Sequence, residues 1–172
     1  MATRLLTLAD EAKYAALYEL ARVDLTSGLA TFWPEGAPPL NPGTVAEWIT
    51  RFRSWGSFSG TTLRGAVTAR SAPIDGEAGN ELYIWITLPS LTTTAFKTVS
   101  KELLTAWWTA IQAEGVPWGW GMNVMTYPTK TETLFARMIT VGMSVETRTI
   151  NARQWRIVKM QPTDALTKLV LV

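Results

Sequence analysis

The order of predicted elements between residues 81 and 160 is the feature that most limits the folds open to this chain. Residues 82–86 are almost continuously apolar, which is typical of a strand covered on both faces in the middle of a sheet. After a turn that contains Pro89, apolar residues at helical spacing predict a helix over 97–114. The remainder predicts a strand over 118–125, a short helix ended by Gly142, and a hairpin of strands over 143–150 and 154–160.

The first half of the chain predicts two helices between two strands. Thr7 followed by Asp10 is a capping-box pattern, and Thr44 followed by Glu47 repeats it. The second helix is expected to continue until Gly56. In chain order, the expected elements are a strand over 3–8, a helix to about residue 25, a loop over 33–43, a helix over 44–55, a strand over 61–70 and a turn over 71–80.

These elements predict an α/β (α+β) fold in which about four helices flank a mixed, largely antiparallel central sheet. A chain of 172 residues is long enough for one domain with its own core, and no linker or internal repeat divides it. We therefore expect a single domain over 1–161, followed by an apolar tail over 162–172.

The chain contains no cysteine and no histidine. Thiolate nucleophiles, the usual zinc sites and Ser-His-Asp catalysis are therefore excluded, and we expect no metal site. Any general acid or base must be Asp, Glu, Lys, Tyr or a water molecule that they hold.

The charge pattern gives little reason to expect a nucleic-acid partner. The net charge is only +2, although the terminal hairpin carries Arg148, Arg153, Arg156 and Lys159. A nucleic-acid interface would combine a denser basic cluster with exposed aromatic residues, so a solvated outer face of two strands is the simpler reading. Steep salt dependence of binding would be the signature of the alternative.

No stretch approaches the roughly 20 apolar residues that a membrane span requires. The first seven residues also lack the apolar run of a signal peptide. We expect a protein that stays in the cytoplasm where it is made.

The segment over 81–160 resembles the core of the GNAT family of acyl-CoA N-acyltransferases, in which a strand, a turn and a long helix hold the cofactor. In that family, backbone amides of the turn and the helix N-terminus bind the pyrophosphate of acetyl-CoA. The resemblance therefore implies a GNAT-like fold. It also implies a cofactor-binding segment, whose residues here would be Leu88, Thr92, Thr93, Thr94 and Lys97.

The chain departs from the family pattern at this turn, which has no glycine and carries bulky side chains at Thr93, Thr94 and Phe96. The family's tyrosine general acid corresponds to Met138, which cannot donate a proton. The remaining candidates for catalysis are Tyr127, in a turn before the short helix, and Glu81, for which a solvated position at the strand end is the alternative.

These departures lead to two hypotheses of function. The first is a non-catalytic, GNAT-like structural or assembly protein without a cofactor. The Trp-rich, Cys-free and His-free chain is similar in character to bacteriophage proteins, so a virion component is expected. Its partners would be other proteins or further copies of itself. The residues expected at the interface are those of the apolar tail, Leu166, Leu169, Val170, Leu171 and Val172.

The alternative is an acetyl-CoA-dependent N-acyltransferase with a divergent phosphate turn. Transfer of an acyl group to an amine needs no histidine or cysteine, because a carboxylate can accept the amine proton through water. Gly119 and Gly121 in the strand over 118–125 would permit the strand to splay and receive the thioester.

Overall fold

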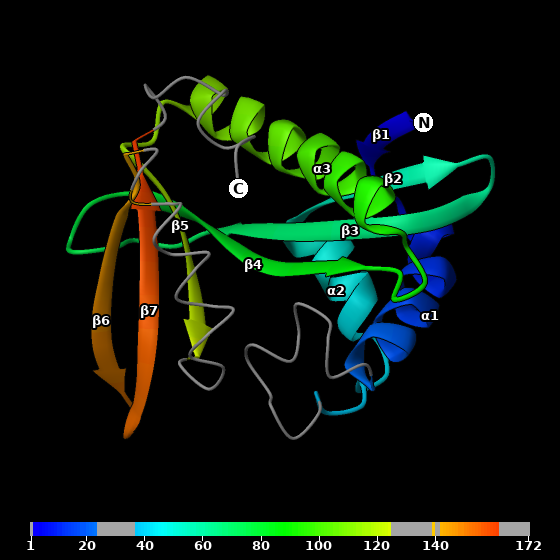
Figure 1. Ribbon diagram of the computed structural model, residues 1–172, viewed down its shortest axis with the longest axis horizontal. Coiled ribbons are helices and arrows are strands. Elements are labelled where there is room, and N and C mark those ends of the chain that lie inside the picture. Colours follow the sequence, from blue (N-terminus) through cyan, green and yellow to red (C-terminus); the bar gives the residue numbers. More distant parts are fainter. Residues whose placement is uncertain (1, 24–36, 125–138, 140–141, 162–172) are drawn as a thin grey trace.

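A computed structural model describes residues 2–23, 37–124, 139 and 142–161. In it, helices cover both faces of one sheet (Figure 1). The helices are η1 (Leu8–Asp10, a 3-10 turn), α1 (Glu11–Arg22), α2 (Thr44–Arg51) and α3 (Thr93–Glu114). The strands are β1 (Ala2–Leu5), β2 (Arg53–Ser59), β3 (Thr62–Ser71), β4 (Gly79–Thr87), β5 (Trp118–Val124), β6 (Ser144–Ile150) and β7 (Arg153–Met160).

The seven strands form one sheet in the order β1-β2-β3-β4-β5-β7-β6. Among the strands that the structure describes, only β4 and β5 pair in parallel, and every other neighbouring pair is antiparallel. The parallel pair is joined by α3, as a parallel connection requires a crossover. The predicted mixed, largely antiparallel sheet is therefore confirmed.

Apolar cores lie on both faces of this sheet. On one face, α1 and α2 bury Tyr14 and Trp48 against Ile86 of β4. On the other face, α3 buries Trp108 against Val67 of β3 and neighbouring side chains. The first helix, α1, buries Tyr14, Leu17, Tyr18 and Ala21.

The prediction of one helix over 44–55 is wrong at its second half. The helix ends at Arg51, and Phe52 is extended, with φ −111° and ψ −177°. The next seven residues form β2, which pairs with β1 on one side and β3 on the other. Trp48 and Trp55 are spaced as in a helix, yet they pack into cores on opposite faces of the sheet. Hydrogen-bonded ladders on both sides of β2 outweigh the weak helical periodicity.

The second half of the chain agrees with its prediction more closely. The long helix α3 begins at Thr93, before the predicted start at Lys97. The terminal hairpin turns at Asn151 and Ala152, which both have positive φ. The short helix predicted before Gly142 lies almost wholly outside the described residues, so three α-helices are described where about four were expected.

Candidate functional site

β4 carries a β-bulge at Tyr83. Thr68 of β3 pairs with Ile84. The next residue of β3, Ala69, pairs with Leu82, so Tyr83 has no partner on β3. Tyr83 and Ile84 therefore both pack toward α1 and α2, while Leu82 packs toward α3. Such an extra residue bends its strand and increases the local twist.

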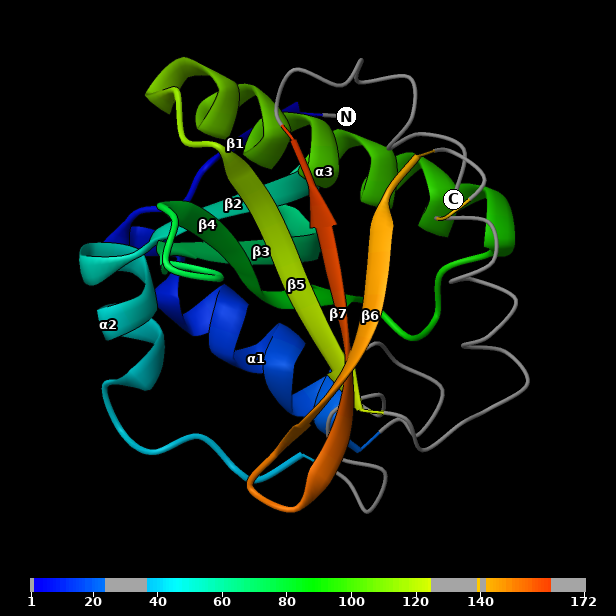
Figure 2. The ribbon, with the colours of Figure 1, turned by 90° about the vertical axis from the view of Figure 1, so that its left-hand side faces the viewer.

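The bulge lies where β4 and β5 separate. Their parallel pairing ends after three residue pairs, the last of which joins Glu81 and Trp120. Beyond this point β5 follows β7 to Val124, whereas β4 follows β3 to Thr87. Figure 2 shows the two strands running in different directions. No described strand pairs with the second edge of β4 after Glu81, so that edge is the candidate site for an extended ligand.

The N-terminus of α3 follows the separated end of β4. Thr92 caps this helix, and its hydroxyl accepts a hydrogen bond from the Ala95 N–H at 3.3 Å. Thr93 and Thr94 are exposed in the first turn, and Lys97 is exposed on the next. Amides at a helix N-terminus and a nearby cation both favour an anion.

Leu88 and Phe96, near the two ends of the predicted cofactor turn, contact other parts of the protein. The Leu88 N–H donates to the Arg64 carbonyl at 2.9 Å, and its carbonyl accepts from the Leu91 N–H at 3.2 Å. Phe96 is 42% exposed and stacks on Trp85, with ring centroids 6.3 Å apart. An aromatic ring therefore stands in the stretch where the family resemblance implies a glycine.

Glu81 is buried, which corrects the expectation of a solvated carboxylate at the strand end. Its side chain is 3% exposed, and its Oε2 accepts a hydrogen bond from the Arg70 Nε at 2.6 Å. The guanidinium carbon of Arg70 lies 4.2 Å from the ring centroid of Tyr83 and 6.0 Å from that of Phe52. A buried carboxylate is retained here because a cation pairs with it.

Arg70 and Tyr83 are not among the residues predicted for the site, although the sequence holds a signal for one of them. Asp75 and Gly76 form a two-residue turn with positive φ at both positions. Counting outward from such a turn pairs Arg70 with Glu81, which is the observed register. No comparable signal marks the bulge, because one extra residue does not show in a short, continuously apolar run.

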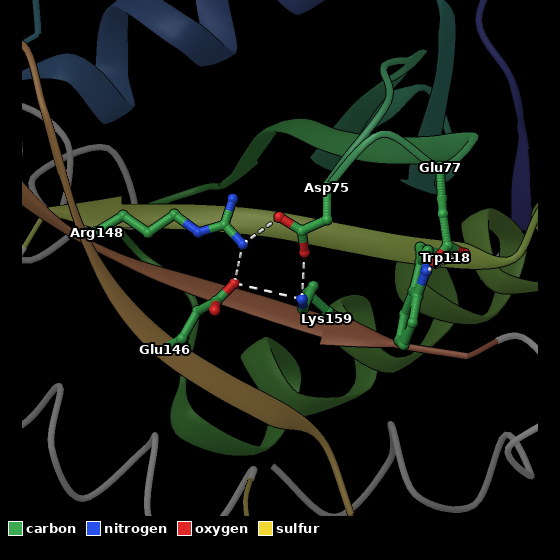
Figure 3. A network of polar contacts seen from close by, with 6 residues as sticks. All are labelled: Asp75, Glu77, Trp118, Glu146, Arg148 and Lys159. Carbon is green, nitrogen blue, oxygen red and sulfur yellow. Dashed lines mark hydrogen bonds and ion pairs between the residues drawn. The ribbon is translucent and has the colours of Figure 1, made fainter.

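Acidic residues partly neutralise the basic residues of the terminal hairpin, which the nucleic-acid alternative would use (Figure 3). Asp75, in the turn before β4, accepts hydrogen bonds from Arg148 at 2.6 Å and Lys159 at 2.5 Å. Arg148 also pairs with Glu146. The hydrogen bond from Lys159, followed by that from Arg148, lowers the pKa of the Asp75 carboxyl from its ordinary value. These contacts tie the turn to β6 and β7 at the end where β4 and β5 are joined.

Several predicted residues lie outside the described residues, so the roles expected of them stay predictions. They are Tyr127, Met138 and the tail residues Leu166, Leu169, Val170, Leu171 and Val172. Among the residues that are described, no three acidic, histidine or cysteine side chains gather as a metal site. In the same part of the chain, no helix is both long and apolar enough to cross a membrane.

No protein-family profile and no curated protein matches this sequence. In three dimensions the chain is similar to an N-acetyltransferase from Staphylococcus aureus, with a TM-score of 0.65, 10% identity, and coverage of 94% of this chain and 97% of that one. A ribosomal-protein-alanine N-acetyltransferase from Brucella melitensis gives a TM-score of 0.67 at 13% identity, over 94% and 99% of the two chains.

A third similar structure, yncA from Salmonella typhimurium with its cofactor acetyl-CoA, gives a TM-score of 0.65 at 12% identity, over 95% of each chain. Identities this low establish likeness of fold alone. Over about 94% of its length, then, this chain has the α+β fold of the GNAT acetyltransferases.

Proposed function

We propose that the protein binds an acyl-CoA thioester along the free edge of β4 and transfers the acyl group to an amine. The observation that carries this proposal is the coincidence of the bulge at Tyr83 with the end of the β4–β5 pairing. This coincidence leaves backbone N–H and C=O groups of β4 without a described strand partner, and an extended ligand can pair with such an edge.

The free edge of β4 has a suitable group at each end for the phosphates and the thioester of an acyl-CoA. The six steps from Glu81 to Thr87 rise about 3.3 Å each, which separates the ends by about 20 Å. At the far end, the first turn of α3 and Lys97 would hold the phosphates. At the near end, the thioester would lie beside Tyr83 and the buried Glu81.

The reaction can proceed with the side chains present. The amine nitrogen attacks the thioester carbonyl carbon, a C–N bond forms, and the C–S bond breaks to release the thiolate. The attacking nitrogen gives up one proton and the thiolate takes one. Because Arg70 occupies Oε2 of Glu81, the departing proton would reach Oε1, directly or through a water molecule.

A non-catalytic assembly role, including one in a bacteriophage particle, is the second candidate. The observation that favours it is the Phe96 ring stacked on Trp85 at the start of α3. Together with the engaged backbone of Leu88, this ring narrows the approach of a pyrophosphate to the helix amides. A protein in this role would bind no acyl-CoA and would form stable oligomers.

Titration calorimetry of the purified protein with acetyl-CoA, and with coenzyme A as the control, separates the two candidates. We expect a dissociation constant on the order of 10 µM, which corresponds to about −7 kcal/mol. Absence of heat, together with no thermal stabilisation at millimolar ligand, would reject the acyltransferase and leave the assembly role.

A further inference from the structure

Arg70 is held rigidly on two sides beside the bulge of β4. Its Nε donates to the buried Glu81 at 2.6 Å, and its guanidinium lies over the ring of Tyr83 with the central carbon 4.2 Å from the ring centroid. Despite these contacts, 36% of the Arg70 side chain is exposed. A group that is already fixed loses little conformational entropy when it binds a ligand.

The ion pair of Arg4 and Asp10 is a useful comparison, because in it the carboxylate engages the arginine fully. Arg4 also pairs with a buried carboxylate, that of Asp10, and also lies over a ring, that of Phe58, at 4.4 Å. However, both terminal nitrogens of Arg4 donate to Asp10, each at 2.7 Å. The terminal nitrogens of Arg70 make no hydrogen bond with any described residue, since only its Nε is used.

We infer that Arg70 binds the carboxylate of the acceptor, the molecule that receives the acyl group, and that this acceptor is a free amino acid. The inference rests on the proposed acyl transfer. The planar pair of terminal N–H groups matches the two oxygens of a carboxylate. Its position over Tyr83, two residues beyond the last β4–β5 pair at Glu81, places it next to the expected thioester.

The neighbouring charges favour an amino acid over a phosphate-bearing acceptor. Arg70 and Glu81 lie side by side as one positive and one negative group. A dianionic phosphate on Arg70 would be repelled by the Glu81 carboxylate. An amino acid carries an ammonium and a carboxylate on the same Cα. Its carboxylate would face Arg70 while its nitrogen faces Glu81. The ammonium would first lose one proton, to water or to Glu81, because only the neutral amine can attack the thioester.

Two measurements test this inference with the standard L-amino acids, each compared with its own α-amide. The first follows the Arg70 Nε–H resonance by NMR without acetyl-CoA, with R70K identifying the signal. The second follows thiol release from acetyl-CoA. We expect a preference of about tenfold or more for at least one acid over its amide, because a charge-assisted hydrogen bond is lost in the amide.

The variant R70Q/E81Q removes both charges together and should abolish this preference. The single variant R70K keeps the charge without the planar fork and should reduce it, which provides a readout even if the double variant does not fold. R4Q/D10N is the matched control and should keep the preference.

The two proposals can fail separately. Equal responses to acids and amides, with thiol release present, would overturn the role of Arg70 and leave acyl transfer intact. A shift of the Arg70 resonance with acids alone, without thiol release, would support the anion site and reject the transferase. No response of Arg70 to any acid would also overturn the inference.

Discussion

The charge of Lys97 tests, at the scale of one residue, whether the first turn of α3 holds phosphates. The residue is exposed one turn into the helix. Replacing it by glutamate puts a negative charge where the anion is proposed to bind, so K97E should weaken acetyl-CoA binding by about tenfold to a hundredfold. Calorimetry measures the change in dissociation constant.

Lys13 provides the matched control, because it is exposed on α1, on the opposite face of the sheet. K13E makes the same change of charge and should leave the dissociation constant close to that of the unaltered protein. Equal weakening by both variants would show that only the net charge matters, and would remove the phosphate site from α3.

For single residues, the sequence predicts the secondary structure in which a residue lies better than it predicts the burial and contacts of its side chain. The long helix is predicted where it is found and ends at Glu114 as expected, although it begins at Thr93, after the cap Thr92, rather than at Lys97. The environment of Glu81 is not a local property, since its carboxylate pairs with Arg70 on the neighbouring strand, and Arg70 in turn lies near the ring of Phe52, which follows α2.

Gly119 controls how closely two elements, β5 and α3, can approach. A Cβ at this position would lie 2.6 Å from Cδ1 of Ile111 and 2.9 Å from Cζ3 of Trp108. Both neighbours are fully buried and have little room to move. G119A should therefore lower the free energy of unfolding by about 1–3 kcal/mol, as measured by urea denaturation.

Gly121 lies in the same strand, yet a Cβ there would be 3.7 Å from its nearest neighbour, the Leu82 carbonyl oxygen. G121A should therefore change the free energy of unfolding much less than G119A. If the two variants were equally stable, steric contact with α3 would not be the reason for the glycine at position 119.

An element is predicted correctly where its apolar residues repeat at the spacing of one kind of secondary structure. It is predicted wrongly where that spacing continues from one element into a different one. The apolar run of β4, the stripe of α3 and the terminal hairpin each carry one unambiguous period. β2 follows α2 with a single intervening residue, Phe52, so its first residues continue a helical spacing. Pairing with two neighbouring strands decides its conformation, and no local pattern reports that pairing.

For the whole molecule, the pair of Arg4 and Asp10 gives stability a defined pH dependence. The Asp10 carboxylate is 2% exposed and also accepts the Thr7 N–H at 3.0 Å. The hydrogen bonds from Arg4 hold the pKa of Asp10 well below its usual range. The unfolded-state pKa is about 3.9, so this stabilisation is complete above about pH 5 and is lost as the pH falls toward the folded-state value.

D10N should therefore lower the free energy of unfolding at pH 7 by about 2 kcal/mol, and the difference from the unaltered protein should shrink below about pH 4. Thermal or urea unfolding over pH 3–7 measures this difference. D75N is the control, because the carboxylate that it removes is exposed and should contribute little. A difference for D10N that stays constant with pH would exclude the ionised carboxylate as its cause.

The short parallel contact between β4 and β5 has a mechanical consequence. The sheet consists of two antiparallel groups of strands, β1 to β4 and β5, β7 and β6. At one end the two groups are joined by three residue pairs between β4 and β5 and by the ion pairs of Asp75. No described strand pair joins the two groups at the other end, near Thr87 of β4 and Val124 of β5. The separation of β4 and β5 at that end can then adjust to the width of a bound molecule without loss of a hydrogen bond between strands in either group.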